Sequence, residues 1–259
     1  MVCMIGISSP LFSVQPFDQI LEEIVKAFKL WEIVAEIEHD LSKNESRIRN
    51  AIDSFDMKFQ VHAPIADMNL GALTESAREA SLNQMLSIMD ISHRVGIETI
   101  TVHPGMAIAY GENIKPKVRE ATRRSLRTLD KKMRDLNVRI ALENMPPMDW
   151  SIGLDLPELL SMIEDTEIGI CFDTGHANVA KTLESFLRGG YPLINVHIHN
   201  NHGEFDEHLV IDAGSIDIAR VVDALRKFYS GNYIIEARTL LEGIESRDKL
   251  KTLLEKGDS

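Results

Sequence analysis

Short apolar runs alternate with longer amphipathic stretches about eight times along this chain of 259 residues. Most of the runs are almost continuous in Val, Ile and Leu, which is typical of strands buried on both faces of a parallel sheet. We predict strands over residues 3–8, 31–37, 57–62, 99–103, 139–144, 168–173, 193–199 and 233–238. The repeated alternation limits the fold to an α/β class in which helices cover a parallel sheet.

The stretches between the runs carry apolar residues at the spacing of one helix face. Met85 and Met89 belong to such a stripe, as expected for a helix that packs against a sheet. Asp155, two residues before Pro157, predicts the start of one helix, and Ser246 predicts the start of the last one.

Strict alternation implies parallel strands joined by right-handed crossovers. An open doubly wound sheet would alternate in the same way. However, the chain ends with a full eighth unit, and no glycine-rich dinucleotide-binding turn follows the first strand. We therefore predict a closed (β/α)₈ TIM barrel, as one domain over residues 1–259, a usual length for this fold.

The formal net charge of −12 disfavours strong, nonspecific binding to a phosphate backbone, although a local basic groove would still permit nucleic-acid binding. No run approaches the ~18 apolar residues of a membrane span, and the N-terminal residues resemble a strand rather than a signal peptide. Cys3 and Cys171 lie in apolar runs, so we expect free thiols and a reducing cytoplasm. The sequence leaves a homo-oligomer open.

Polar residues gather where predicted strands end. The histidines at these positions are His62, His103, His176, His197, His199 and His202. The acidic residues are Glu36, Glu143, Asp173 and Glu236. In a barrel, these ends surround one mouth, where buried carboxylates would be costly unless cations neutralised them. Mixed imidazole and carboxylate groups suit Zn, Mn, Co or Fe better than Mg or Ca, which predicts an open catalytic metal site.

Six ordered motifs carry a resemblance that covers nearly the whole chain. They are VHAP with His62, VHPG with His103, ENM with Glu143, CFDTGHA with Asp173, VHIHN with His197 and IIEAR with Glu236. The chain resembles the xylose isomerase-like barrel superfamily, which joins sugar isomerases and epimerases to abasic-site nucleases of the endonuclease IV type.

The resemblance implies a divalent metal cofactor, one to three ions of Zn, Mn or Co. The sugar epimerases of the superfamily hold one central metal, and the corresponding residues here are Glu143, Asp173, His197 and Glu236. The nuclease branch holds two more. The corresponding residues are His62 and His103, with Glu143 bridging, and His176 with Asp206 and His208. The presence of all these residue types does not choose between the two reactions.

Departures from the nuclease pattern favour sugar chemistry. The His-Ala-Pro stretch continues into Ile65 and Ala66, where nuclease relatives carry a Tyr-Leu pair that probes DNA. The nuclease motif DTCH reads DTGH here, and HLND reads HIHN. The run HIHNNHGEFDEHL instead resembles a stretch of sugar-phosphate isomerase/epimerase relatives. Gly203 lies near the position of an arginine in the 3-epimerases, which leaves the exact class open.

The resemblance therefore implies a metal-dependent isomerase or epimerase acting on a small sugar or sugar phosphate, with an abasic-site nuclease as the alternative. A metal chelated by a keto-sugar would stabilise an enediolate, while Glu143 and Glu236 act as the catalytic acid and base. Candidate substrate-binding residues are His62, His103, His176, Glu36, Trp150 and Arg238. A non-catalytic binding module fits poorly, because the four central ligands are intact.

Overall fold

Eight parallel strands close into a barrel in the order β1 to β8 in the computed structural model, which describes residues 3–108 and 112–256. The strands are β1 Ile5–Ser8, β2 Leu30–Val34, β3 Lys58–His62, β4 Thr99–Val102, β5 Arg139–Glu143, β6 Gly169–Asp173, β7 Leu193–Ile198 and β8 Tyr233–Glu236. Parallel pairing of β1 with β8, from Ile5 with Tyr233 to Ser8 with Glu236, closes the ring. The predicted (β/α)₈ barrel is confirmed.

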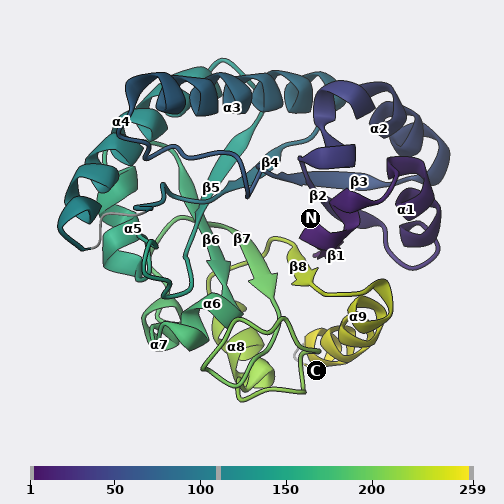
Figure 1. Ribbon diagram of the computed structural model, residues 1–259. Helices are drawn as coiled ribbons and strands as arrows, with labels where there is room; N and C mark the ends of the chain where they lie inside the picture. The colour runs from purple at the N-terminus through teal and green to yellow at the C-terminus, as the bar shows by residue number, and fades with distance from the viewer. Residues whose placement is uncertain (1–2, 109–111, 257–259) are drawn as a thin grey trace.

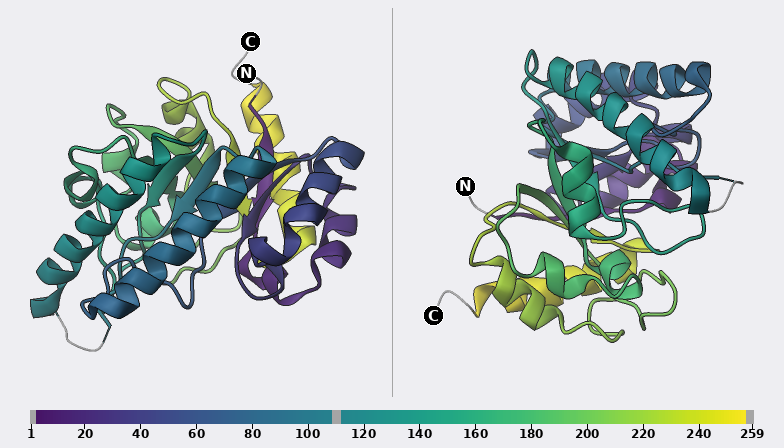
Figure 2. Two further views of the ribbon diagram at one scale, coloured as in Figure 1. Left: turned by 90° about the horizontal axis from the view of Figure 1, so that it is seen from above. Right: turned by 90° about the vertical axis from the view of Figure 1, so that its left-hand side faces the viewer.

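Helices surround the strands on all sides (Figure 1). They are α1 Phe17–Ile24, α2 Leu41–Phe55, α3 Glu75–Val95, α4 Lys115–Met133, α5 Leu156–Ile163, α6 Thr174–Val179, α7 Leu183–Phe186, α8 Ile218–Leu225 and α9 Leu240–Glu255. Short 3-10 helices lie at η1 Pro10–Val14, η2 Ile37–His39 and η3 Glu112–Ile114. The long helices α3 and α4 lie side by side (Figure 2). Within the described ranges, no helix is long and apolar enough to cross a membrane.

The strands alternate between an outer apolar face and an inner polar one, because successive side chains point to opposite sides. One outward residue from each strand belongs to the core beneath the helices: Ile7, Ile33, Val61, Ile100, Leu142, Phe172, Val196 and Ile235. Their neighbours in the strands include Glu32, Gln60, Thr101, Glu143, Asp173, Asn195, His197 and Glu236, all buried. The interior of this barrel therefore carries a polar layer where many barrels are filled with branched apolar side chains.

Two predicted boundaries were wrong. β2 ends at Val34 rather than at residue 37, because Ile37 adopts a left-handed conformation with φ of 55° and begins η2. The last helix begins at Leu240, where Thr239 caps it by accepting a hydrogen bond from the amide of Glu242. Ser246 is a buried residue inside that helix. The other strands match their predicted ranges to within two residues at each end.

Candidate metal centre

Four acidic or imidazole side chains converge at the carboxyl ends of β5 to β8. Glu143, Asp173, His197 and Glu236 are all buried, and each offers one ligand atom within 4.8 Å of the others. Strand register explains this meeting, since Asp173 pairs with His197 across β6 and β7 and both side chains enter the barrel. His197 Nδ1 lies 3.0 Å from Glu143 Oε1 and 3.1 Å from Glu236 Oε1. These are the four residues that the family resemblance implies for a central metal.

The two oxygens of the Asp173 carboxylate have different surroundings. Its Oδ1 accepts hydrogen bonds from the backbone amide of His176 at 2.6 Å and from His199 Nε2 at 3.1 Å. Its Oδ2 is buried, has no hydrogen-bond partner in the described part of the chain, and lies 4.0 Å from His197 Nδ1. An unpartnered buried carboxylate oxygen is costly, so this atom fits a cation in the space between the four side chains.

Two further histidines show the same need for a cation. His62 Nδ1 lies 2.7 Å from the carbonyl oxygen of Ala63, and His176 Nδ1 lies 2.8 Å from that of Asn144. A carbonyl only accepts, so both Nδ1 atoms carry hydrogen. The opposite nitrogens face carboxylates: His62 Nε2 is 3.1 Å from Glu143 Oε2. A neutral imidazole would there direct a lone pair at an anion, so either a second proton or a metal ion must lie between them.

A proton on the imidazole nitrogen can supply the positive charge between the imidazole and the carboxylate. Burial lowers the pKa of His62, but the hydrogen bond to Glu143 and the charges of Glu143 and Glu32 together outweigh burial and raise the pKa. Burial also lowers the pKa of His176, but the nearby carboxylates of Asp173 and Asp206 outweigh burial and raise this pKa well above its usual value. At His103, by contrast, burial prevails and the pKa is lowered. The imidazoles with raised pKa values are the ones that a metal would have to deprotonate.

Two additional ligand groups flank the central four residues. Glu143 Oε2 lies 3.1 Å from His62 Nε2 and 3.3 Å from His103 Nε2, which brings together the first predicted group. On the other side, Asp206 Oδ2 lies 3.2 Å from His176 Nε2 and 3.4 Å from His208 Nδ1. The structure thus brings together both of the extra ligand groups that the nuclease resemblance implies.

His199 joins the second flanking group, a role that sequence reasoning left undecided. Its ring stacks on that of His208 with centroids 4.0 Å apart, and its Nε2 lies 3.6 Å from Asp206 Oδ1. That oxygen is buried and has no hydrogen-bond partner among the described residues. Burial lowers the pKa of His208, but the nearby carboxylates of Glu236 and Asp206 outweigh burial and raise this pKa to about 9.

One buried acid escaped the sequence analysis. Glu32, in the middle of β2, has no exposed surface, and its Oε1 lies 2.8 Å from His197 Nε2. The available signal was a single charged residue inside the apolar run LWEIV. We instead selected Glu36, which accepts hydrogen bonds from the amides of Ile65 and Ala66 and so supports the loop after β3.

Other candidate residues lie outside the cluster. Arg238 forms an ion pair with Glu242 at the start of α9. Trp150 lies exposed on the loop after β5, and His202 pairs with Glu207 at 2.9 Å on the surface. A substrate-binding role for Glu36, Trp150 or Arg238 stays a prediction.

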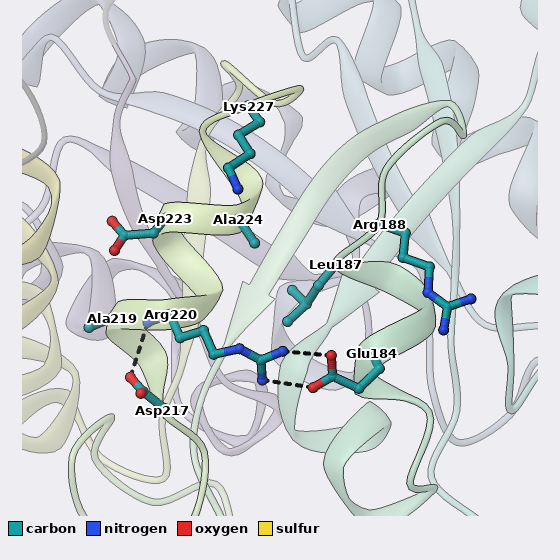
Figure 3. Close-up of a pocket in the computed structure, with 9 residues that line it drawn as sticks. All are labelled: Glu184, Leu187, Arg188, Asp217, Ala219, Arg220, Asp223, Ala224 and Lys227. Atoms are coloured by element: carbon teal, nitrogen blue, oxygen red, sulfur yellow. Dashed lines mark hydrogen bonds and ion pairs between the residues drawn. The ribbon is translucent and has the colours of Figure 1, made fainter.

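A groove of about 500 Å³ lies away from this centre, on the outside of the barrel between α7 and α8 (Figure 3). Arg220 spans it through two hydrogen bonds to Glu184, at 2.7 and 2.6 Å. Acidic and basic side chains alternate along its walls, so their charges largely offset one another. We assign no chemistry to this groove.

Gly175 leaves room for the ring of His199. A Cβ added at Gly175 would lie 1.9 Å from His199 Cε1, far inside contact distance. Gly175 occupies the position at which DTGH departs from DTCH, and His199 is one of the positions at which HIHN departs from HLND. The two departures from the nuclease pattern are therefore sterically linked.

Comparison with known proteins places this geometry in a family context. The profile of the family described as "Xylose isomerase-like TIM barrel" matches residues 21–254. An uncharacterised protein of Methanocaldococcus jannaschii is 30% identical over 96% of this chain and 89% of its own length. A crystal structure of a D-tagatose 3-epimerase-like protein is 30% identical, with a TM-score of 0.90 over 97% of each chain. Endonuclease IV from Thermus thermophilus, at 20% identity over 98% of this chain and 99% of its own, shares the fold with a TM-score of 0.71.

We predict that metal binding releases protons. Burial lowers the pKa of His197, but the charges around it, among them those of Glu32, Glu143 and Glu236, raise it well above its usual value. This imidazole therefore holds an extra proton that an ion bound at the central site would replace. The affinity for Zn²⁺ should therefore fall as the pH falls. Calorimetric titration in buffers of different ionisation enthalpy measures the effect. Identical binding enthalpies in every buffer would contradict it.

We also predict that Gly175→Ala destabilises the protein by about 1–3 kcal/mol, because the added methyl group must displace His199. Replacing His199 with the smaller Asn should relieve much of that cost in the double variant. The free energies of unfolding of the two single variants and the double variant form a thermodynamic cycle. Strict additivity would show that the two positions are not coupled.

Proposed function

The chain belongs to the xylose isomerase-like TIM barrel family, and we propose that it is a divalent-metal-dependent isomerase or epimerase of an unphosphorylated sugar. Support comes from the four-ligand cluster at the carboxyl ends of the strands, where barrel enzymes carry their active sites. The similarity to a D-tagatose 3-epimerase-like protein points in the same direction.

The charge of the barrel mouth is the observation that carries the proposal. The segments that follow the strands span 9–16, 35–40, 63–74, 103–114, 144–155, 174–182, 199–217 and 237–239. Their sequences contain twelve Asp or Glu residues but only two Lys or Arg, Lys181 and Arg238. Lys181 Nζ donates to the carbonyl oxygen of Gly203 at 2.7 Å, and Arg238 pairs with Glu242. Binding to a DNA backbone or a sugar phosphate draws on available cations, so this mouth suits a neutral substrate better.

Apolar side chains accompany the acidic ones at the mouth. The large exposed hydrophobic residues on the described parts of these segments and at the start of α9 are Leu11, Val14, Ile37, Leu73, Ile108, Met148, Trp150, Phe205 and Leu241. A sugar presents C–H faces as well as hydroxyl groups, and an apolar rim around a polar floor complements both. This arrangement supports a small-molecule substrate.

Glu143 and Glu236 are suited to moving a proton between substrate atoms. They arise from β5 and β8 and present their Oε1 atoms to the same nitrogen of His197. Burial raises the pKa of each, but the charge of His197 and the hydrogen bonds from the surrounding histidines together outweigh it and hold both pKa values well below the usual range. Both groups are therefore carboxylates at neutral pH, the form that can accept a proton.

The remaining oxygens of the two acids are held in place. His62 and His103 contact Glu143 Oε2, and His208 lies 3.0 Å from Glu236 Oε2. A divalent ion held by Glu143, Asp173, His197 and Glu236 would supply Lewis acidity next to a substrate carbonyl. One glutamate would take the proton beside that carbonyl and the other would return a proton. Return to the same carbon from the opposite face gives an epimer. Return to the original carbonyl carbon, together with loss of the hydroxyl proton from the neighbouring carbon's oxygen and protonation of the original carbonyl oxygen, gives an isomer.

An abasic-site nuclease is the second candidate, and a specific observation favours it. Both flanking ligand groups, His62 with His103 and His176 with Asp206 and His208, are complete. Two metals beside the central one would suit phosphodiester hydrolysis.

Metal stoichiometry, measured with a strand-cleavage assay, separates the two candidates. We expect one tightly bound divalent ion per chain after dialysis without chelator, and no cleavage of a duplex that carries an abasic site. Three zinc ions per chain together with cleavage at that site would make the nuclease the function.

For the sugar reaction, we expect Glu143→Gln and Glu236→Gln each to lower kcat by at least about 100-fold, the scale of general acid–base catalysis. The substrate panel is a set of unphosphorylated ketoses and their phosphates, followed by NMR in D₂O through exchange of the proton next to the carbonyl. Glu38→Gln, at an exposed position on the same mouth, is the control. Metal content must be measured for each variant, so that loss of the ion is distinguished from loss of the base. Full turnover in both active-site variants would contradict the mechanism.

A further inference from the structure

We infer that Glu32 is a positioning residue that fixes the proton and the orientation of His197, and thereby sets how tightly the central site holds its metal. The inference rests on the proposed function only in requiring that His197 binds a metal. It does not depend on which substrate the enzyme takes.

Glu32 lies directly beneath the metal centre and is fully buried. One oxygen, Oε2, accepts hydrogen bonds from Asn195 Nδ2 at 2.7 Å, Gln60 Nε2 at 3.2 Å and Thr101 Oγ1 at 3.4 Å. These donors come from β7, β3 and β4, on different sides of the barrel. Since a buried carboxylate is costly unless donors surround it, this convergence maintains an anion at this point.

The other oxygen is left for His197. Glu32 Oε1 has no hydrogen bond in the described ranges, yet it lies 2.8 Å from His197 Nε2. The two atoms are not aligned as a hydrogen bond, but a lone pair on Nε2 this close to a carboxylate oxygen would be repelled, so Glu32 favours the form of His197 with a hydrogen on Nε2. A carboxylate only accepts, which assigns that hydrogen to the imidazole. Nδ1 is then the nitrogen free to bind a metal, and it is the one that faces Glu143 and Glu236.

Asn195 does not offset this assignment. Its Nδ2 lies 3.2 Å from His197 Nε2, a distance at which it could donate to that nitrogen. However, an amide nitrogen carries two hydrogens, and Glu32 Oε2 at 2.7 Å and Thr101 Oγ1 at 2.9 Å are both closer acceptors. The two amide hydrogens are therefore committed to Glu32 and Thr101.

A chain of hydrogen bonds anchors Glu32 from below. Gln60, which donates to Glu32, accepts at its own Oε1 from Asn232 Nδ2 at 3.0 Å. Asn232 in turn accepts at Oδ1 from the backbone amide of Met4 at 3.1 Å. The chain runs from a metal ligand to the opposite end of the barrel. It helps to fix the position of Glu32, as a precise ligand position requires.

The test is the metal affinity of Glu32→Gln in the full-length protein. A neutral amide would remove the negative charge behind His197 and could donate to Nε2, which would permit the wrong tautomer. Loss of such a supporting partner typically costs about 10- to 100-fold in metal affinity, and we expect a loss of that size. Competition with a chromophoric chelator measures Zn²⁺ affinity, and the absorption spectrum of the Co²⁺-loaded protein reports a change in the ligand field.

Asp130→Asn is the matched control. Asp130 is a buried carboxylate on α4 that binds Arg134 and the amide of Glu167, away from the strand ends. Its replacement should reduce stability but leave Zn²⁺ affinity and the Co²⁺ spectrum unchanged. Wild-type affinity and an unchanged spectrum in Glu32→Gln would overturn the inference, since Glu32 would then only fill the barrel.

A second measurement needs no variant of Glu32 and stands even if Glu32→Gln does not fold. Nitrogen–proton NMR of the Zn²⁺-loaded protein with ¹⁵N-labelled histidine identifies the protonated nitrogen of each ring, and His197→Asn assigns the signal. We expect the proton of His197 on Nε2. A proton on Nδ1 would overturn the inference. Both measurements report metal binding rather than turnover, so an absence of sugar isomerisation would refute the proposed function without touching this result.

Discussion

Repulsion among carboxylates that have been removed from water is the constraint around which this barrel is organised. Glu32, Glu143, Asp173 and Glu236 lie within the same small volume and are all buried. No arrangement of neutral side chains could stabilise four such anions. The surrounding imidazoles balance this charge. Backbone carbonyls and further acids orient those imidazoles. In the metal-free protein the balance is made with protons, and a divalent ion would replace them.

The sequence allowed the architecture to be predicted because strand ends and helix faces leave periodic signals. The sequence also indicated which residues meet at the mouth, since side chains at the carboxyl ends of parallel barrel strands all lie at the same end of the barrel. Glu32 was missed for a physical reason. A polar residue in the middle of a strand leaves the same trace whether it points into the barrel or between barrel and helices, and only the closed register distinguishes them. The end of β2 was missed because Ile37, a β-branched residue, continues the apolar pattern while its backbone turns left-handed.

The two branches of the family differ here less in their ligands than in what surrounds them. The structure brings together the residues of both candidate ligand groups, so the proposed preference for a sugar over DNA rests on the loops. Those loops are acidic and apolar, and their few cations are already engaged with the protein. Gly175 and His199 also distinguish this chain from the nuclease pattern. A larger residue at position 175 would exclude the imidazole of His199.

The hydrogen-bond chain that runs from His197 through Glu32 and Gln60 to Asn232 has a consequence for folding. Asn232 immediately precedes β8, and the amide of Met4 that it holds immediately precedes β1, so the chain is complete only when the first and last strands have met. Until then, Gln60 lacks the contact from Asn232, and Glu32 is held through Asn195 and Thr101 without this support. A partly folded barrel, in which β8 has not yet paired, also lacks Glu236. The four side chains of the central cluster therefore come together only when the barrel has closed.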